Sequence, residues 1–295
     1  MRNFADVLYQ RRANVKSNII LKIDTNFEKL PPWLKKSKVS EFGRNWAAVS
    51  ESLVVYEKYI IETISPYICC IMPRLSSYLQ YGAYGLRALE CTIVQALRHE
   101  LPVIVDARFA EYSSTNNNLA GNGVIGRVMG WDGLQPSNLH AHGVSIIPYY
   151  GKQMIEDYIN LCDEMNRGLV VVCNENTDFN LLSQYANRLI GNETENSGLT
   201  VMIEDHNLPL INKVEKSSLS TIISFPDIYD AIEMQQLWDS LNSNLKKRTF
   251  VSLGSEIHDS VDSSGEPFIK DEEIIKSHFS DCVKQAKFYQ KLFFI

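Results

Sequence analysis

The sequence has no excess of positive charge, no long apolar run and no closely paired cysteines. Its 295 residues include 29 Lys and Arg against 35 Asp and Glu, a net charge of −6, which argues against a nucleic-acid-binding protein. We find no run of about 18 apolar residues and no signal-peptide pattern, so we expect no membrane segment. The six cysteines lack zinc-site or disulfide-scaffold spacing. We therefore expect a cytoplasmic protein with reduced thiols and with neither metal nor cofactor.

The composition is that of a chain with a substantial core, since 45% of its residues are hydrophobic. Eight short apolar runs rich in β-branched residues alternate with longer amphipathic stretches, which is typical of buried parallel strands joined by helices. The runs are 19–23, 68–72, 103–105, 144–147, 169–173, 199–203, 221–223 and 250–253. Eight strands close a (β/α)₈ barrel. The rival, an open doubly wound sheet, favours a glycine-rich turn after the first run, which is absent here. We predict an α/β, (β/α)₈ TIM-barrel domain over residues 1–295.

The amphipathic stretches predict helices between the runs. Residues 86–97 place their apolar side chains on one face of a helix that Gly85 opens, and similar patterns cover 154–165 and 228–245. Residues 255–295 begin polar and end apolar. We expect a C-terminal helical extension there, whose last helix covers the barrel. A segment that binds a partner is the alternative.

In such a barrel, chemistry occurs where strands end, so the residues after each run are the candidates. After the third run, residues 106–111 (DARFAE) hold two carboxylates and a cation, which would shift one another's pKa in an enclosed site. A solvated turn is the alternative interpretation. The groups after the eight runs are Asp24, 72–74, 106–111, 148–151, 174–178, 204–206, 224–227 and 254–256.

Residues 101–115 (LPVIVDARFAEYSST) resemble the third-strand signature of orotidine 5′-phosphate decarboxylases, Asp-x-Lys-x-x-Asp followed by a short Ser/Thr stretch. Other landmarks follow in the family's order. Residues 23–31 are similar to its first-strand segment, 81–90 to the segment after strand two, and 148–151 (PYYG) to its Asn-Pro-Tyr-x-Gly. The resemblance covers roughly residues 4–180. It implies a lyase of pyrimidine biosynthesis that converts orotidine monophosphate to uridine monophosphate and carbon dioxide.

The sequence departs from this family at the positions that carry its chemistry. The resemblance implies an array of two lysines and two aspartates, in which the third-strand Lys protonates the carbanion left by carbon dioxide. Here Met72 stands at the strand-two Lys and Asp106 matches, whereas Arg108 replaces the proton-donating Lys and Glu111 replaces the last Asp. A guanidinium is a poor proton donor. The extra methylene of Glu111 moves its carboxylate by about 1 Å, which can cost about 100-fold in rate.

The positions that bind substrate depart as well. The family holds the phosphate with a glycine-rich turn after strand seven and an Arg after strand eight, whereas residues 224–228 and 253–257 lack both and contain acids. The strand-five turn, Thr-Ser-Asn in the family, corresponds to residues 174–177, and the strand-four Asn to Ile147. The substrate-binding positions that the resemblance implies are Asp24, Met72, Thr115, Pro148 and Asn176.

We therefore predict a divergent barrel with weak or lost decarboxylase activity, in which Asp106, Arg108 and Glu111 are the catalytic remnants. One alternative is a noncatalytic regulatory or structural partner, as a homodimer or as a heterodimer with a related barrel, because the family's members form dimers. Another is an enzyme of altered specificity, in which Arg108 binds an anionic small molecule and Glu111 or Glu175 is the base. His140 and His142 have short metal-ligand spacing, but loop imidazoles are the simpler interpretation.

Overall fold

The computed structural model describes residues 2–109, 119–204, 208–217, 219–225, 230–264 and 272–294. Each of the eight predicted runs overlaps one strand of a single parallel sheet, so the strand predictions are confirmed. The strands are β1 (Ile19–Ile23), β2 (Cys70–Pro73), β3 (Ile104–Phe109), β6 (Gly143–Ile146), β7 (Gly168–Val172), β8 (Leu199–Glu204), β9 (Ser220–Ser224) and β10 (Thr249–Leu253).

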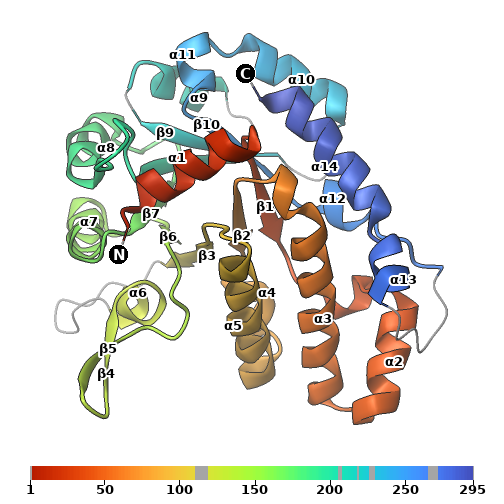
Figure 1. The fold of residues 1–295 in the computed structure, drawn as a ribbon. Helices are drawn as coiled ribbons and strands as arrows, with labels where there is room; N and C mark the ends of the chain where they lie inside the picture. Colours follow the sequence, from red (N-terminus) through yellow and green to blue (C-terminus); the bar gives the residue numbers. More distant parts are fainter. Residues whose placement is uncertain are drawn as a thin grey trace.

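The sheet curves into a nearly closed (β/α)₈ barrel, as predicted. Its strand order is β2-β1-β10-β9-β8-β7-β6-β3. The two end strands meet through parallel bridges that join Ile71 to Val103 and Arg74 to Asp106. The amide of Ile71 also donates to the carbonyl of Pro102 at 3.0 Å. Helices surround the strands (Figure 1).

The helical segments follow the predicted pattern with two corrections. The helix expected over 86–97 begins at Gly82, so Gly85 lies inside it and does not open it. A Cβ at Gly85 would lie 1.9 Å from the carbonyl oxygen of Tyr78, which explains the glycine as a close approach between helices. The stretch 228–245 is divided between two helices, because the side chain of Asn242 caps a new helix by accepting from the amide of Leu245. The helices are α1 (Phe4–Val15), α2 (Pro32–Phe42), α3 (Trp46–Ile64), α4 (Leu75–Leu79), α5 (Gly82–Arg98), α6 (Leu119–Val124), α7 (Lys152–Met165), α8 (Phe179–Ala186), α9 (Leu208–Glu215), α10 (Ala231–Ser240), α11 (Ser243–Lys246), α12 (Ser255–His258), α13 (Glu272–Ser277) and α14 (Ser280–Phe293), with 3₁₀ turns η1 (Phe27–Lys29), η2 (Ser65–Tyr67) and η3 (Asn187–Leu189).

Apolar side chains fill the barrel, and α1 closes its amino end. The hydroxyl groups of Tyr9 and Ser220 lie 2.7 Å apart, and the ring of Tyr9 packs edge-on against Phe250. The apolar interior cluster contains Phe4, Leu8, Tyr9, Ile20, Cys69, Cys70, Met72, Ile104, Val170, Val172, Met202, Ile222 and Phe250.

The C-terminal tail is helical, as predicted, and its last helix covers the barrel wall. The ring of Phe293 on α14 lies 5.5 Å from that of Trp238 on α10, and Phe279 lies 5.8 Å from Tyr56 on α3. Nδ2 of Asn18 donates to the carbonyl of Phe293 at 2.9 Å. The apolar end of the tail is thus packed on its own barrel. Within the described ranges, none of the helices combines the length and apolar character needed to cross a bilayer.

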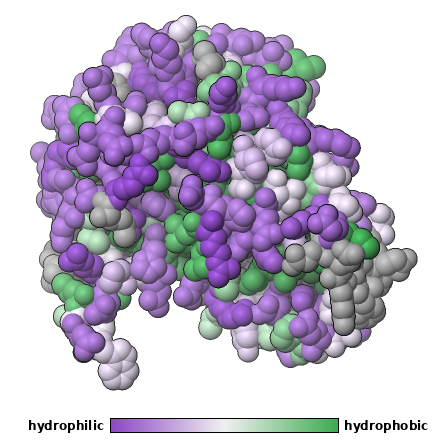
Figure 2. Space-filling view, viewed as in Figure 1, coloured by the Kyte–Doolittle hydropathy of each residue, from purple (hydrophilic) through white to green (hydrophobic). Residues whose placement is uncertain are grey.

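An antiparallel hairpin projects from the barrel between β3 and β6. It consists of β4 (Arg127–Gly130) and β5 (Gly133–Pro136). Figures 1 and 2 show it at the lower left, extending away from the body of the molecule. Its apolar side chains are exposed: Met129 by 76%, Leu134 by 60%, and Trp131 at the turn completely. We call this element the apolar arm.

Candidate functional site

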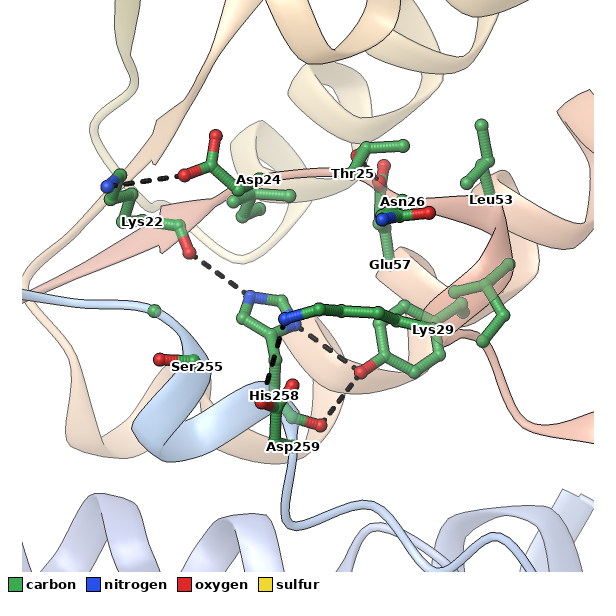
Figure 3. A pocket seen from close by; sticks show the side chains of 14 residues that line it. Lys22, Asp24, Thr25, Asn26, Lys29, Leu53, Glu57, Ser255, His258 and Asp259 are labelled. Carbon is green, nitrogen blue, oxygen red and sulfur yellow. Dashed lines mark hydrogen bonds and ion pairs between the residues drawn. The ribbon is translucent and has the colours of Figure 1, made fainter. Parts of the chain in front are cut away.

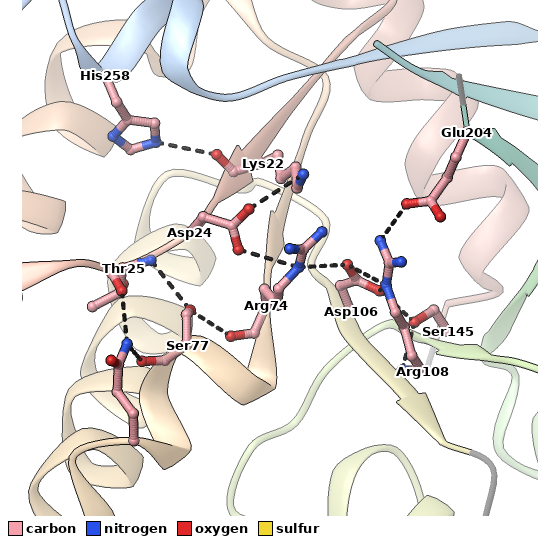
Figure 4. Close-up of polar contacts among 11 residues, drawn as sticks. Lys22, Asp24, Thr25, Arg74, Ser77, Asp106, Arg108, Ser145, Glu204 and His258 are labelled. Atoms are coloured by element: carbon pink, nitrogen blue, oxygen red, sulfur yellow. Dashed lines mark hydrogen bonds and ion pairs between the residues drawn. The ribbon is translucent and has the colours of Figure 1, made fainter. Parts of the chain in front are cut away.

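The barrel mouth holds six charged side chains of alternating sign, joined by ion pairs. They come from the carboxyl ends of β1, β2, β3 and β8 (Figure 4). With three bases and three acids, this group has no formal net charge. We call it the charged row. In order, its members are Lys22, Asp24, Arg74, Asp106, Arg108 and Glu204.

The first half of the charged row joins β1 to β2 and β3. Nζ of Lys22 lies 3.2 Å from Oδ2 of Asp24, and Nε of Arg74 lies 3.1 Å from Oδ1 of the same carboxylate. Nε of Arg74 also lies 3.4 Å from Oδ2 of Asp106. Arg74 therefore bridges two carboxylates across the point where the barrel closes.

The second half centres on Asp106, whose side chain is only 1% exposed. Nε of Arg108 donates to both of its oxygens, at 3.1 and 3.2 Å, and Nη2 of Arg108 donates to Oε1 of Glu204 at 2.7 Å. The Ser145 hydroxyl donates to Oδ1 of Asp106 at 2.7 Å and accepts from the amide of Arg108 at 2.9 Å. These bonds satisfy a carboxylate that would be costly to bury without partners.

Arg108 has a strained backbone. Its φ is +48°, in the left-handed region, which costs a non-glycine residue about 1–2 kcal/mol. The register between β3 and β6 shifts at the same place, between Val105 and Phe109. Such strain persists only where surrounding contacts hold it, and it concentrates at functional sites. Here the hydrogen bond from the Arg108 amide to Ser145 and the ion pairs of its guanidinium with two carboxylates hold this backbone conformation.

The electrostatics of Arg108 oppose proton donation. Burial lowers the pKa of its guanidinium, but the hydrogen bond to Glu204 and the attraction of Asp106 outweigh burial, and the net shift is upward. A group that holds its proton more tightly than an ordinary arginine is an even poorer general acid. Arg108 can bind or stabilise an anion at this position.

The structure brings together only some of the predicted site residues. Asp24, Asp106 and Arg108 lie in the charged row, whereas Met72 is 1% exposed within the apolar interior cluster. Pro148 lies in the loop after β6, where its carbonyl accepts from the amide of Gly151. Asn176 is exposed in the turn after β7. The remaining predicted residues, Glu111 and Thr115, lie outside the described residues.

The sequence-based prediction passed over Lys22, Arg74 and Glu204 as individual site residues. Arg74 takes part in the charge balance, because it supplies Asp106 with the cation that Met72, two residues earlier, does not. The sequence did hold a signal for Lys22, because this lysine is the single charged residue within its apolar run. In a strand, residues i and i+2 share a face, so Lys22, Asp24 and Ile20 all belong to the interior face.

The two loop histidines do not share a ligand site. His140 is exposed, and Nδ1 of His142 accepts from the amide of Val103 at 3.2 Å. Burial lowers the pKa of His142 to about 4, so its imidazole is neutral. In the part of the chain that the structure describes, no group of three potential metal ligands is found.

A cavity of about 70 Å³ lies beside the start of the charged row, between the end of β1, α3 and α12 (Figure 3). Lys22 and Asp24 line one side, and His258 and Glu57 line another. Nε2 of His258 lies 3.1 Å from the carbonyl oxygen of Lys22. Burial lowers the pKa of His258 to about 4, so the ring is neutral and Nε2 donates this hydrogen bond.

Glu57 anchors the loop that carries Asp24. Its buried carboxylate accepts from the hydroxyls of Thr25, Thr92 and Tyr78, the last at 2.9 Å. Burial raises the pKa of Glu57 to about 7, although the three hydroxyl groups each lower it. Since Thr25 follows Asp24, and Tyr78 lies on the helix that follows Arg74, this cluster fixes the two strand ends that meet in the charged row.

A second set of bonds fastens the same two strand ends. The amide of Thr25 donates to Oγ of Ser77 at 3.2 Å, and Oγ of Ser77 donates to the carbonyl of Arg74 at 2.7 Å. Nε2 of Gln80 donates to the carbonyl of Thr25 at 3.2 Å. Hydrogen bonds of the adjacent backbone therefore hold Asp24 and Arg74 in position for their ion pair (Figure 4).

The curated proteins that are similar to this chain in sequence carry the same name. No protein-family model matches the chain. The orotidine 5′-phosphate decarboxylase of Thermomicrobium roseum is 28% identical over 170 residues, which is 58% of this chain and 50% of that protein. The enzyme of the same name from Caldicellulosiruptor saccharolyticus is 23% identical over 172 residues, 58% of this chain and 56% of that protein. The chain thus matches about half the length of these curated relatives.

Solved structures with the same fold cover the chain more completely. A putative orotidine-monophosphate decarboxylase from Toxoplasma gondii is 16% identical, with a TM-score of 0.68 over 98% of this chain and 95% of that one. The decarboxylase of Leishmania donovani is 15% identical, with a TM-score of 0.62 over 98% and 97%. These likenesses are evidence for the barrel fold. Taken with the curated relatives, they show that the chain is similar to orotidine 5′-phosphate decarboxylases, in sequence over about half of those proteins and in fold over nearly the whole chain.

Proposed function

We propose that this chain is a decarboxylase-family barrel in which decarboxylation of orotidine monophosphate is weak or lost, and whose charged row binds a small anionic ligand. The observation that carries the proposal is Arg108, which stands at the proton donor's position and is held by two carboxylates. Decarboxylation leaves an electron pair on carbon that must take up a proton. A guanidinium held in this way does not release one at neutral pH.

The phosphate-binding side supports the same proposal. After β10, the amide of Gly254 donates to Oε2 of Glu256 at 2.8 Å. A carboxylate thus occupies a backbone donor at the strand end where an anion would otherwise find one. The negative charge of Glu256 would also repel a phosphate there. Without phosphate anchoring, an enzyme loses the remote binding energy that lowers its chemical barrier.

The cations of the charged row favour an anionic ligand. Lys22 and Arg74 are 19% and 27% exposed, so their charged groups are accessible at the mouth. A carboxylate or phosphate of the ligand would compete with Asp24 for these two cations. Because the row is neutral without a ligand, we expect modest affinity, as the ligand must displace existing ion pairs.

We expect turnover of orotidine monophosphate to be at least about 100-fold slower than that of an active family member assayed in parallel, since a catalytic group displaced by about 1 Å can cost about 100-fold in rate. Loss of substrate absorbance measures turnover. Thermal shift with orotidine monophosphate, uridine monophosphate and inorganic phosphate measures binding, and ligand at about 100 times its Kd would stabilise by about 2.7 kcal/mol. Turnover at an ordinary rate of about 10 s⁻¹ would contradict the loss of activity.

A second candidate function is that of a noncatalytic dimer partner in the cytoplasm, as a homodimer or with a related barrel. The apolar arm favours it, because Met129, Trp131 and Leu134 expose contiguous apolar surface of the kind found at protein interfaces. We expect light scattering to give the mass of a dimer for the wild-type chain and of a monomer for Trp131→Ser. A wild-type chain that is monomeric at its highest soluble concentration, alone and with a related barrel, would contradict this candidate.

A further inference from the structure

We propose that Lys22, at the carboxyl end of β1, is the proton donor of this barrel, in place of the β3 position that Arg108 occupies. The proposal rests on the proposed function in one respect: it takes the charged row as the ligand site. It goes further by assigning any remaining proton transfer to one atom, Nζ of Lys22. The substrate class is a carboxylate whose loss of carbon dioxide leaves a carbanion.

Only one cation among the described members of the charged row has the chemistry of a proton donor. Its three cations are Lys22, Arg74 and Arg108, and two of these are guanidinium groups. An ammonium exchanges its proton within the range that general acids use, whereas a guanidinium stays protonated above about pH 12. Lys22 is therefore the single cation of the row that can deliver a proton to carbon.

The geometry suits this role. Lys22 shares the interior face with Ile20 and pairs in register with Met72, both of which belong to the apolar interior cluster. The apolar floor excludes water from below, while the 19% exposed side chain remains accessible from the mouth. The carboxylate of Asp24, 3.2 Å from Nζ, limits the directions that the ammonium group can take.

The backbone and the stem of Lys22 are also held in place. Its carbonyl accepts the hydrogen bond from Nε2 of His258 at 3.1 Å. Its stem passes Gly254, where an added Cβ would lie 3.6 Å from Cβ and 3.9 Å from Cδ of Lys22. The hydrogen bond fixes the backbone of Lys22, and the glycine leaves room for the stem beside it. A fixed donor is what efficient proton transfer requires.

The proposed step balances as follows. The bond between the ring carbon and the carboxylate breaks, carbon dioxide leaves, and the electron pair stays on carbon. That carbon forms a bond to a proton from Nζ of Lys22, which becomes a neutral amine. Water at the mouth then returns a proton to the amine. Arg74 and Arg108 stabilise negative charge during the step and transfer no proton.

The test uses the full chain with Lys22→Arg, Lys22→Met and the control Lys29→Met. Lys29 is a second lysine near the mouth, 60% exposed and 3.8 Å from Asp259. We expect both Lys22 variants to lower the release of carbon dioxide from carboxyl-labelled orotidine monophosphate at least about 100-fold, and Lys29→Met to leave it unchanged. Lys22→Arg is decisive, because it keeps the charge and the pair with Asp24 but cannot donate. Its uridine monophosphate binding, read by thermal shift, should stay within a few-fold of wild type.

Turnover retained by Lys22→Arg would overturn the assignment of Lys22. A wild-type chain that binds the nucleotide but releases no carbon dioxide would also overturn it, while leaving the proposed function intact. A chain that binds neither nucleotide nor phosphate would overturn the proposed function, and the assignment with it. Because Lys22→Arg preserves the charged row, a melting temperature near that of wild type separates loss of chemistry from loss of folding.

Discussion

Replacing the buried acid Glu57 by glutamine is expected to remove a pH dependence of stability worth about 3 kcal/mol. The folded-state pKa of Glu57 is raised to about 7 by burial, from its ordinary value of 4.5. Between these two values, the folded chain binds a proton that the unfolded chain has already released. The free energy of unfolding therefore decreases as the pH rises from about 4.5 to 7, and stays lower above that.

The Gln side chain of Glu57→Gln is neutral at every pH, so the variant has no such penalty. We expect the difference in free energy of unfolding between Glu57→Gln and wild type to move in favour of the variant by about 3 kcal/mol between pH 4 and pH 8. The lowered pKa values of His142 and His258 destabilise both proteins equally at low pH, so they cancel in this difference. Urea unfolding at four or five pH values measures it.

Tyr78→Phe is the matched control for Glu57→Gln. It removes one of the three hydroxyls that donate to Glu57 but leaves the acid in place. We expect a lower stability at all pH values, with the wild-type fall between pH 4.5 and 7 retained. If the difference between Glu57→Gln and wild type stays flat, Glu57 is ionised in the folded chain at pH 5, and burial does not govern it.

The fold was predictable because its signal is local. Each of the eight apolar runs reports burial on both faces of a strand, and eight such runs separated by helices restrict the topology to very few choices. The rule that strand ends carry chemistry then pointed to Asp24, Asp106 and Arg108, all of which lie in the charged row. Asp24 and Asp106 could be selected because each directly follows an apolar run, and Arg108 because residues 101–115 resemble the family's third-strand signature.

The rest of the charged row depends on distances that the sequence does not contain. Arg108 and Glu204 are 96 residues apart, and their 2.7 Å contact arises from the curvature of the sheet. Lys22 lies inside an apolar run, where a single lysine looks like part of an ordinary strand. Glu57 sits on a helix whose acids are otherwise expected at the surface, and it is buried by tertiary packing against Thr25, Tyr78 and Thr92.

The second large expected effect concerns Met72 in β2 and Arg74 directly after this strand. Met72 and Arg74 share the interior face of the strand, so a cation two residues further along serves Asp24 and Asp106. Met72→Lys adds a fourth cation beside three acids, in a position that is 1% exposed. We expect it to cost about 3–4 kcal/mol in the free energy of unfolding, from desolvation and repulsion by Arg74.

Arg74→Met alone is expected to cost about 1–2 kcal/mol, because Asp24 keeps Lys22 and Asp106 keeps Arg108 as partners. In the double variant, the new ammonium can extend toward the two carboxylates that Arg74 leaves. We therefore expect the double variant to be more stable than the sum of the single losses predicts, by at least about 1 kcal/mol.

The control combines Met72→Lys with Arg87→Met. Arg87 pairs with Glu51 at 2.7 Å on the outer helices and is 52% exposed, so it has no partner in common with Met72. That pair of changes should be additive within about 0.5 kcal/mol. Urea unfolding of the five variants and wild type completes both cycles. Strict additivity for positions 72 and 74 would mean that Arg74 does not compensate for the lysine that is absent at position 72.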